Sequence, residues 1–291
     1  MSEKKAKSNR REFLTGRVLK QAVEQTGENL ADYLNEATED FAAPTGGATI
    51  RLGTRAMATE FAVVMNPGPS RQVMLASDAL DQLHELEQLM TVYRSTSELS
   101  RVNAEAAAGP VAMDARLFEI LDQARQICLE TAGGFDPSSG PLIALWRECR
   151  LQGRIPSQQE IETCLSHTGM EQFQFDPAAK TIQFRSSENE LNLGGIGKGY
   201  ALDVAGAFLT EQELENWLFY GGFSSILAKG THNQLPGWPV GIKNPLFTSQ
   251  RLGTILLHDN AMSTSGSSVQ HFRHEGKRYG HILDPRTGWP V

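Results

Sequence analysis

Residues 190–203 read ELNLGGIGKGYALD, a glycine-rich turn followed by an apolar, alanine-containing helix pattern. Four glycines surround one lysine, Lys198. Glycine has no Cβ, so its backbone can approach a ligand closely, and a helix that starts at such a turn points free N–H groups at one place. This chemistry suits a phosphate or pyrophosphate group. The spacing matches neither G-x-G-x-x-G nor G-x-x-x-x-G-K-[ST], so on this stretch alone a tight structural turn is an equally good interpretation.

The hydrophobic pattern on both sides of the turn predicts an α+β fold. Helices are expected at 71–91, 114–132, 157–168 and about 198–214. Strands are expected around 61–65, in a hairpin through 173–175 and 182–184, and near 217–228, 238–242 and 252–258. Asp114 suits a helix N-cap, and Ser157 with Glu160 has the spacing of a capping box. Because helices gather early and strands late, α+β is favoured over a regular βαβ series.

Composition and charge exclude several classes of protein. The formal net charge is −7 and no basic stripe is present, which argues against nonspecific nucleic-acid binding. Three cysteines in 291 residues are too few and too scattered for a disulfide framework or a zinc site. No run of 18 apolar residues occurs, so no transmembrane segment is expected.

Residues 1–47 read as an N-terminal extension, either a docking helix or a disordered tail. Within it, SNRREFLTG (8–16) resembles a twin-arginine export motif. The residues that follow are polar and charged, whereas a signal peptide requires an apolar stretch there. A cytoplasmic location is therefore expected, with export as the alternative.

Further motifs accompany the glycine turn in a characteristic order. They are GTRAMATEF (53–61), MTVYRSTSELSRVN (90–103), AGGFDPSSGPLIALW (132–146), FYGGFSSI (219–226), WPVGIKNP (238–245), MSTSG (262–266) and HILDPRTGWPV (281–291). Together with NLGGIGKGYALD they resemble the ApbE family, the FAD:protein FMN transferases, from about residue 48 onward. The resemblance implies a single α+β domain over 48–291, with early helices and a later, mainly antiparallel sheet. It implies Mg²⁺-dependent transfer of FMN from FAD to a Thr or Ser hydroxyl of an acceptor protein, with release of AMP.

The same resemblance assigns residues to FAD binding. They are Met57, Tyr93, Gly134, Phe135, Asp136, Asn192, Lys198 and Leu283. A tyrosine is flat with a polar tip, which suits stacking on an isoalloxazine, although Tyr93 alone would read as a half-buried residue at a helix end. Residues 134–136 alone would read as a helix end followed by an Asp-Pro turn. The chain departs from the family pattern at Asn192, where many relatives have aspartate, and at Ala58, where the pattern has glycine.

The resemblance also assigns the chemistry. The backbone carbonyl of Gly195 is the expected Mg²⁺ ligand, Lys198 would neutralise phosphate charge, and His281 is the expected residue for proton transfer. Asp284 is the expected cap of the turn DPRTG at 284–288. The family's other metal ligands lie in a segment that would follow Val291, so the domain reads as truncated at the C-terminus, as a fragment or as a degenerate homologue. Two other functions therefore stay open: an Mg²⁺-dependent FAD pyrophosphatase and a non-catalytic FAD-binding homologue.

Overall fold

The computed structural model describes residues 48–222, 224–244, 247, 250–266 and 271–291. The expected extension at 1–47, with its twin-arginine-like stretch, lies outside the described residues.

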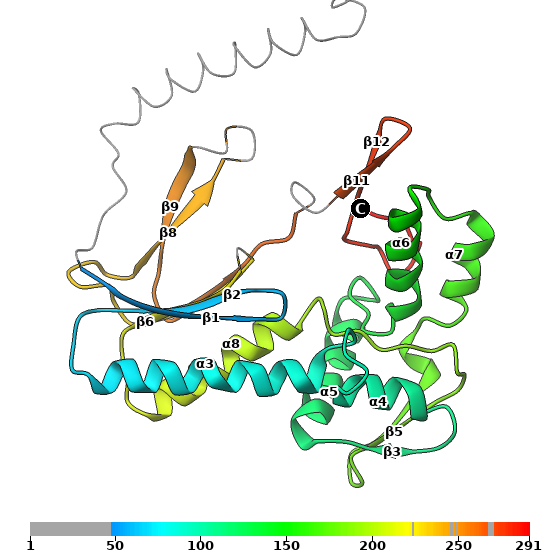
Figure 1. Cartoon of the computed structure of the whole chain (residues 1–291), viewed down its shortest axis with the longest axis horizontal. Helices are drawn as coiled ribbons and strands as arrows, with labels where there is room; N and C mark the ends of the chain where they lie inside the picture. Colours follow the sequence, from blue (N-terminus) through cyan, green and yellow to red (C-terminus); the bar gives the residue numbers. More distant parts are fainter. Residues whose placement is uncertain (1–47, 223, 245–246, 248–249, 267–270) are drawn as a thin grey trace, which may run out of the picture.

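A five-stranded antiparallel sheet forms one side of the molecule (Figure 1). Its strands, in sheet order, are β1 (Ile50–Ala56), β2 (Thr59–Met65), β6 (Trp217–Gly221), β7 (Ser225–Lys229) and β10 (Asn260–Ser263). Side chains alternate between the faces of a strand, and Phe61, Val63 and Met65 of β2 all point inward and are fully buried. The sheet therefore presents one apolar face to the main core.

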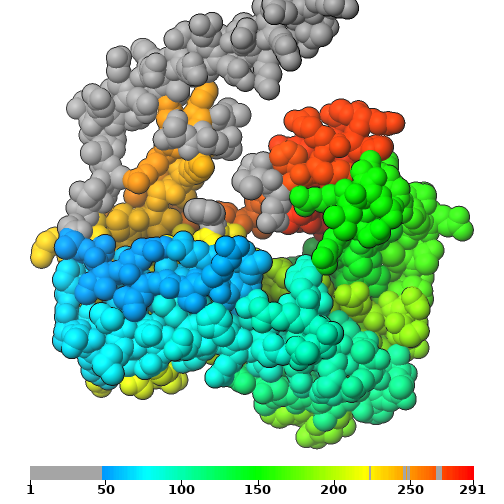
Figure 2. Space-filling model, viewed as in Figure 1, coloured from blue at the N-terminus to red at the C-terminus, as the bar shows by residue number. Residues whose placement is uncertain are grey.

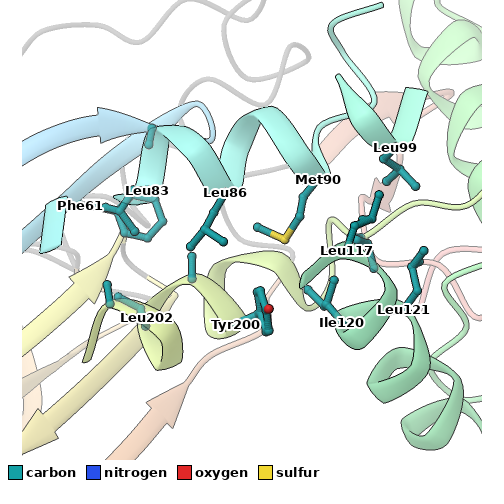
Figure 3. Packing of buried hydrophobic residues seen from close by; sticks show 14 of the residues in the cluster. Phe61, Leu83, Leu86, Met90, Leu99, Leu117, Ile120, Leu121, Tyr200 and Leu202 are labelled. Atoms are coloured by element: carbon teal, nitrogen blue, oxygen red, sulfur yellow. The ribbon is translucent and has the colours of Figure 1, made fainter. Parts of the chain in front are cut away.

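Two helices cover that face, α3 (Arg71–Met90) and α8 (Gly197–Glu211). Leu83, Leu86 and Met90 of α3 lie one helical turn or less apart and point toward α8 (Figure 3). Leu202 and Tyr200 of α8 lie in the same cluster. This interface fixes the position of the glycine turn, because the turn leads directly into α8.

The remaining elements extend the core and flank the sheet. The helices are α4 (Glu98–Glu105), α5 (Ala115–Glu130), α6 (Gly140–Gln152) and α7 (Gln158–Leu165), with a 3₁₀ turn η2 at Met170–Gln172. A three-stranded sheet contains β3 (Val111–Ala112), β5 (Thr181–Phe184) and β4 (Phe173–Asp176), and two hairpins are formed by β8 (Trp238–Lys243) with β9 (Arg251–Leu257) and by β11 (His271–His274) with β12 (Lys277–Gly280). Trp238, Val240 and Leu257 pack the β8–β9 hairpin onto the sheet face opposite to α3.

The α+β prediction is confirmed, and every strand pairing among the described residues is antiparallel. The four expected helices exist as α3, α5, α7 and α8. Asp114 accepts a hydrogen bond from the Arg116 N–H, and Ser157 forms the capping box with Glu160. The strand region expected near 217–228 contains two strands, β6 and β7, because the chain turns back at Gly222, whose φ is 63°.

The hairpin turn between β1 and β2 consists of Met57 and Ala58, with φ of 50° and 58°. Two positive φ values are the requirement of a type I′ turn, which favours glycine at the second position. Alanine pays a steric cost there, so we expect Ala58→Gly to raise the free energy of unfolding by about 1 kcal/mol in urea titrations. The matched control is Ala144→Gly inside α6, which should lower it by about 1 kcal/mol. A loss of stability in Ala58→Gly would contradict the assignment of strain to this turn.

Candidate functional site

The glycine turn ends at the N-terminus of α8. Ile196 occupies the N-cap position and offers no side-chain acceptor to the first turn of the helix. The N–H groups of Ile196 and Gly197 both donate to the carbonyl of Leu193, at 3.1 and 2.7 Å. Lys198, half-buried, follows in the first turn of the helix. Lys198 is therefore in the turn of α8 that carries the positive end of the helix dipole, an arrangement that suits an anion.

A second loop lies against this turn and consists of the predicted site residues 134–136. The N–H of Asn192 donates to the carbonyl of Pro137 at 2.7 Å. A Cβ on Gly195 would lie 3.0 Å from Cε2 of Phe135, so the ring of Phe135 packs closely against the turn at that position. Asp136 accepts hydrogen bonds from the N–H and the Oγ of Ser138, at 2.8 and 2.6 Å. The structure thus brings Phe135 and Asn192 together, with Asp136 held in a fixed turn.

The segment that leads into the glycine turn is held by a side-chain clamp. Asn103 of α4 donates from Nδ2 to the carbonyl of Leu191 and accepts from its N–H, both at 3.0 Å. Glu190 packs against the start of α6, where a Cβ on Gly140 would lie 2.6 Å from the Glu190 carbonyl oxygen. Burial raises the pKa of the Glu190 carboxyl. The backbone before the turn is therefore fixed from two sides.

The C-terminal turn lies beside the end of α5. Gly133, with φ of 75°, closes that helix by donating its N–H to the carbonyl of Cys128 at 2.9 Å. A Cβ on Gly133 would lie 3.8 Å from Cγ of Arg286. Asp284 caps its turn as expected, since Oδ1 accepts from the N–H of Arg286 at 3.0 Å. The Arg286 guanidinium beside it lowers the pKa of the Asp284 carboxyl.

Tyr93 lies just after α3 and is 68% exposed, not half-buried as its isolated reading suggested. The guanidinium carbon of Arg147 lies 5.0 Å from the centre of its ring. The segment is close to the glycine turn, because a Cβ on Gly197 would lie 3.7 Å from Sδ of Met90 at the end of α3. The segment that carries the exposed ring of Tyr93 therefore begins near the start of α8.

Other predicted residues lie on elements outside this group. Met57 packs against the main core from the β1–β2 turn. Leu283 packs in a second cluster around Trp146, and its backbone pairs with Pro290. His281 is exposed in the bend after β12. The binding roles of Met57 and Leu283 and the catalytic role of His281 stay predictions.

Magnesium requires near-octahedral oxygen coordination, usually from carboxylates, substrate phosphates and water. In the part of the chain that the structure describes, no group of three or more His, Cys, Asp or Glu side chains gathers in a way that could hold a metal ion. Gly195 is exposed and offers one backbone carbonyl. These residues do not complete an Mg²⁺ site by themselves.

Several residues around the site were missed from the sequence. Arg147 and Asn103 both lie in segments for which no helix was predicted. No local pattern marks either contact, because the partners lie far away along the chain. In Figure 2 the β8–β9 hairpin (orange) lies over the sheet beside β1 (blue), and the β11–β12 hairpin (red) lies beside α6 (green). None of the helices formed by described residues is long and apolar enough to cross a membrane.

Comparison with known proteins gives one consistent answer. The FAD:protein FMN transferase of Klebsiella pneumoniae is 30% identical over 223 residues, which cover 76% of this chain and 68% of that protein. The Vibrio cholerae enzyme of the same name is 29% identical, over 83% of this chain and 73% of that one. The crystal structure of the ApbE protein from Thermotoga maritima superposes with a TM-score of 0.75 at 28% identity, and covers 84% of this chain and 79% of that one. The flavin transferase ApbE from Vibrio cholerae superposes with a TM-score of 0.71 at 27% identity, over 84% and 78% of the two chains. The profile of the ApbE family matches residues 54–291, and the chain belongs to that family.

Proposed function

We propose that this protein transfers FMN from FAD to a hydroxyl group of an acceptor protein and releases AMP. The observation that carries the proposal is the start of α8, where no side chain caps the helix and Lys198 stands in the first turn. That arrangement suits the pyrophosphate of FAD. The relatives named FAD:protein FMN transferase support the same reaction.

The reaction is a substitution at phosphorus. The hydroxyl oxygen of the acceptor forms a bond to the phosphorus of the FMN half, and the bond from that phosphorus to the bridging oxygen breaks. The bridging oxygen leaves with AMP, and the hydroxyl proton passes to a base. Catalysis of this kind depends on positioning and on stabilising the charge that develops on the phosphate oxygens.

The chain's own residues supply these two effects. Lys198 and the first turn of α8 would hold the pyrophosphate and neutralise its charge. Tyr93 would stack on the isoalloxazine, and Phe135, Asp136 and Asn192 would form the wall of the site next to the glycine turn. His281 is the proposed proton acceptor. A Thr or Ser hydroxyl of the acceptor protein is the proposed nucleophile.

We also propose that FMN transfer requires Mg²⁺, which the EDTA arm of the test below measures. A divalent cation bound by phosphate oxygens would neutralise charge on the pyrophosphate, and Gly195 would give it one carbonyl ligand.

The boundaries of the domain at 48–291 and the cytoplasmic location also stay predictions.

The test is incubation of the purified chain with FAD, Mg²⁺ and a peptide that carries one threonine, followed by mass spectrometry of the peptide and chromatography of the nucleotides. The expected result is a peptide heavier by one FMN, with AMP released in equal amount and both lost in EDTA. A peptide with valine in place of threonine is the control. AMP and free FMN without an adduct would identify a pyrophosphatase, and bound FAD without AMP would identify a non-catalytic binding protein.

A further inference from the structure

Hydrogen bonds fix the backbone around Tyr93, whereas its ring is exposed. The backbone is anchored, because the N–H of Tyr93 donates to Oγ1 of Thr91 at 3.2 Å and Gln88 donates to the carbonyl of Thr96 at 2.7 Å. The ring is 68% exposed, so core packing does not set its orientation. Its one aromatic or cation contact among the described residues is with Arg147 of α6, whose guanidinium carbon lies 5.0 Å from the ring centre.

Arg147 has few other contacts that would place it there. It is exposed on α6, and no carboxylate among the described residues forms an ion pair with it. The neighbouring cation Arg94 is paired with Glu87 at 3.3 Å. A guanidinium stacks flat on an aromatic face, which an ammonium group does less well. Among the described residues, the ring of Tyr93 is the one aromatic or charged group found in contact with the Arg147 guanidinium.

Building on the proposed function, we propose that Arg147 is a positioning residue of the FAD site. A ring has two faces, and a guanidinium on one face leaves the other for a flat ligand. A flavin stacked on that second face would remove water from the ring and its cation, and a cation–π contact strengthens when water is removed. Binding of FAD and stacking of Arg147 on Tyr93 should therefore favour each other.

The test measures FAD affinity by quenching of flavin fluorescence, with EDTA present so that no turnover occurs. Arg147→Ala is expected to raise the Kd about three- to tenfold, which is the range of a cation–π contact that becomes partly desolvated. Arg147→Lys keeps a cation and should recover part of the loss. Arg150→Ala, at another exposed arginine of α6, is the matched control and should leave the Kd unchanged.

Measuring the same substitution in the Tyr93→Ala variant separates an effect of Arg147 through the Tyr93 ring from a direct effect of its charge on FAD binding. In Tyr93→Ala, the further change Arg147→Ala should have no effect on the Kd, because the contact is already lost. An equal loss in both backgrounds, a Kd that Arg147→Ala leaves unchanged, or a fall in Tm in that variant would overturn the proposal. Wild-type protein that does not bind FAD would overturn the proposed function as well, whereas wild-type binding with no effect of Arg147→Ala would overturn this inference alone.

Discussion

Replacing Lys198 with alanine is expected to lower the rate of FMN transfer by about 10²- to 10³-fold, the usual cost of removing one preorganised group that stabilises charge in the transition state. Lys198 lies in the first turn of α8, where no side chain caps the helix. The negative charge on the phosphate oxygens would then lose the ammonium group that neutralises part of it. Single-turnover measurement of AMP release at saturating FAD would give the rate of the chemical step.

The control for this variant is Lys180→Ala, which removes a lysine from the turn between β4 and β5. It lowers the net charge by the same amount and should leave the rate unchanged. The Tm of Lys198→Ala should stay within a few degrees of the wild type, since Lys198 is not part of the buried core. A full rate in Lys198→Ala would show that the Lys198 side chain is solvated and does not contact the pyrophosphate.

The helices that the sequence predicted share strong local signals. α3 and α5 repeat apolar residues at three- and four-residue spacings over 20 and 16 residues, and α7 begins with a capping box. α4 was missed because eight residues with only Leu99 and Val102 buried give too short a pattern. α6 was missed although Pro141 marks its first turn, because Trp146 and Leu142 serve a separate cluster that the sequence does not reveal.

The site could be predicted in its parts but not in its assembly. The glycine turn and the Phe135–Asp136 loop each carry a motif, and the resemblance to a family joined them. The contact of Gly195 with Phe135 and the clamp of Asn103 on Leu191 depend on tertiary packing. Arg147 over Tyr93 depends on how α6 is placed against the end of α3, which no local pattern encodes.

Replacing Leu86 with alanine is expected to lower the free energy of unfolding by about 2–5 kcal/mol, the cost of deleting a large buried side chain whose space is not refilled. Leu86 is 1% exposed and points from α3 toward α8 (Figure 3). A domain is stable by only about 5–15 kcal/mol, so this single change removes a large share of the total. Equilibrium unfolding in urea, followed by circular dichroism, would measure the change.

Two variants of the same helix serve as controls. Leu86→Met nearly conserves volume and should cost less than about 1.5 kcal/mol. Met74→Ala truncates a side chain of α3 that is 66% exposed and should stay within about 0.5 kcal/mol of the wild type. A similar loss in Leu86→Ala and Met74→Ala would contradict the assignment of the α3–α8 interface to the core. Below its unfolding transition, Leu86→Ala should still bind FAD with the wild-type Kd, because the interface places Lys198 without contributing an atom to the ligand site.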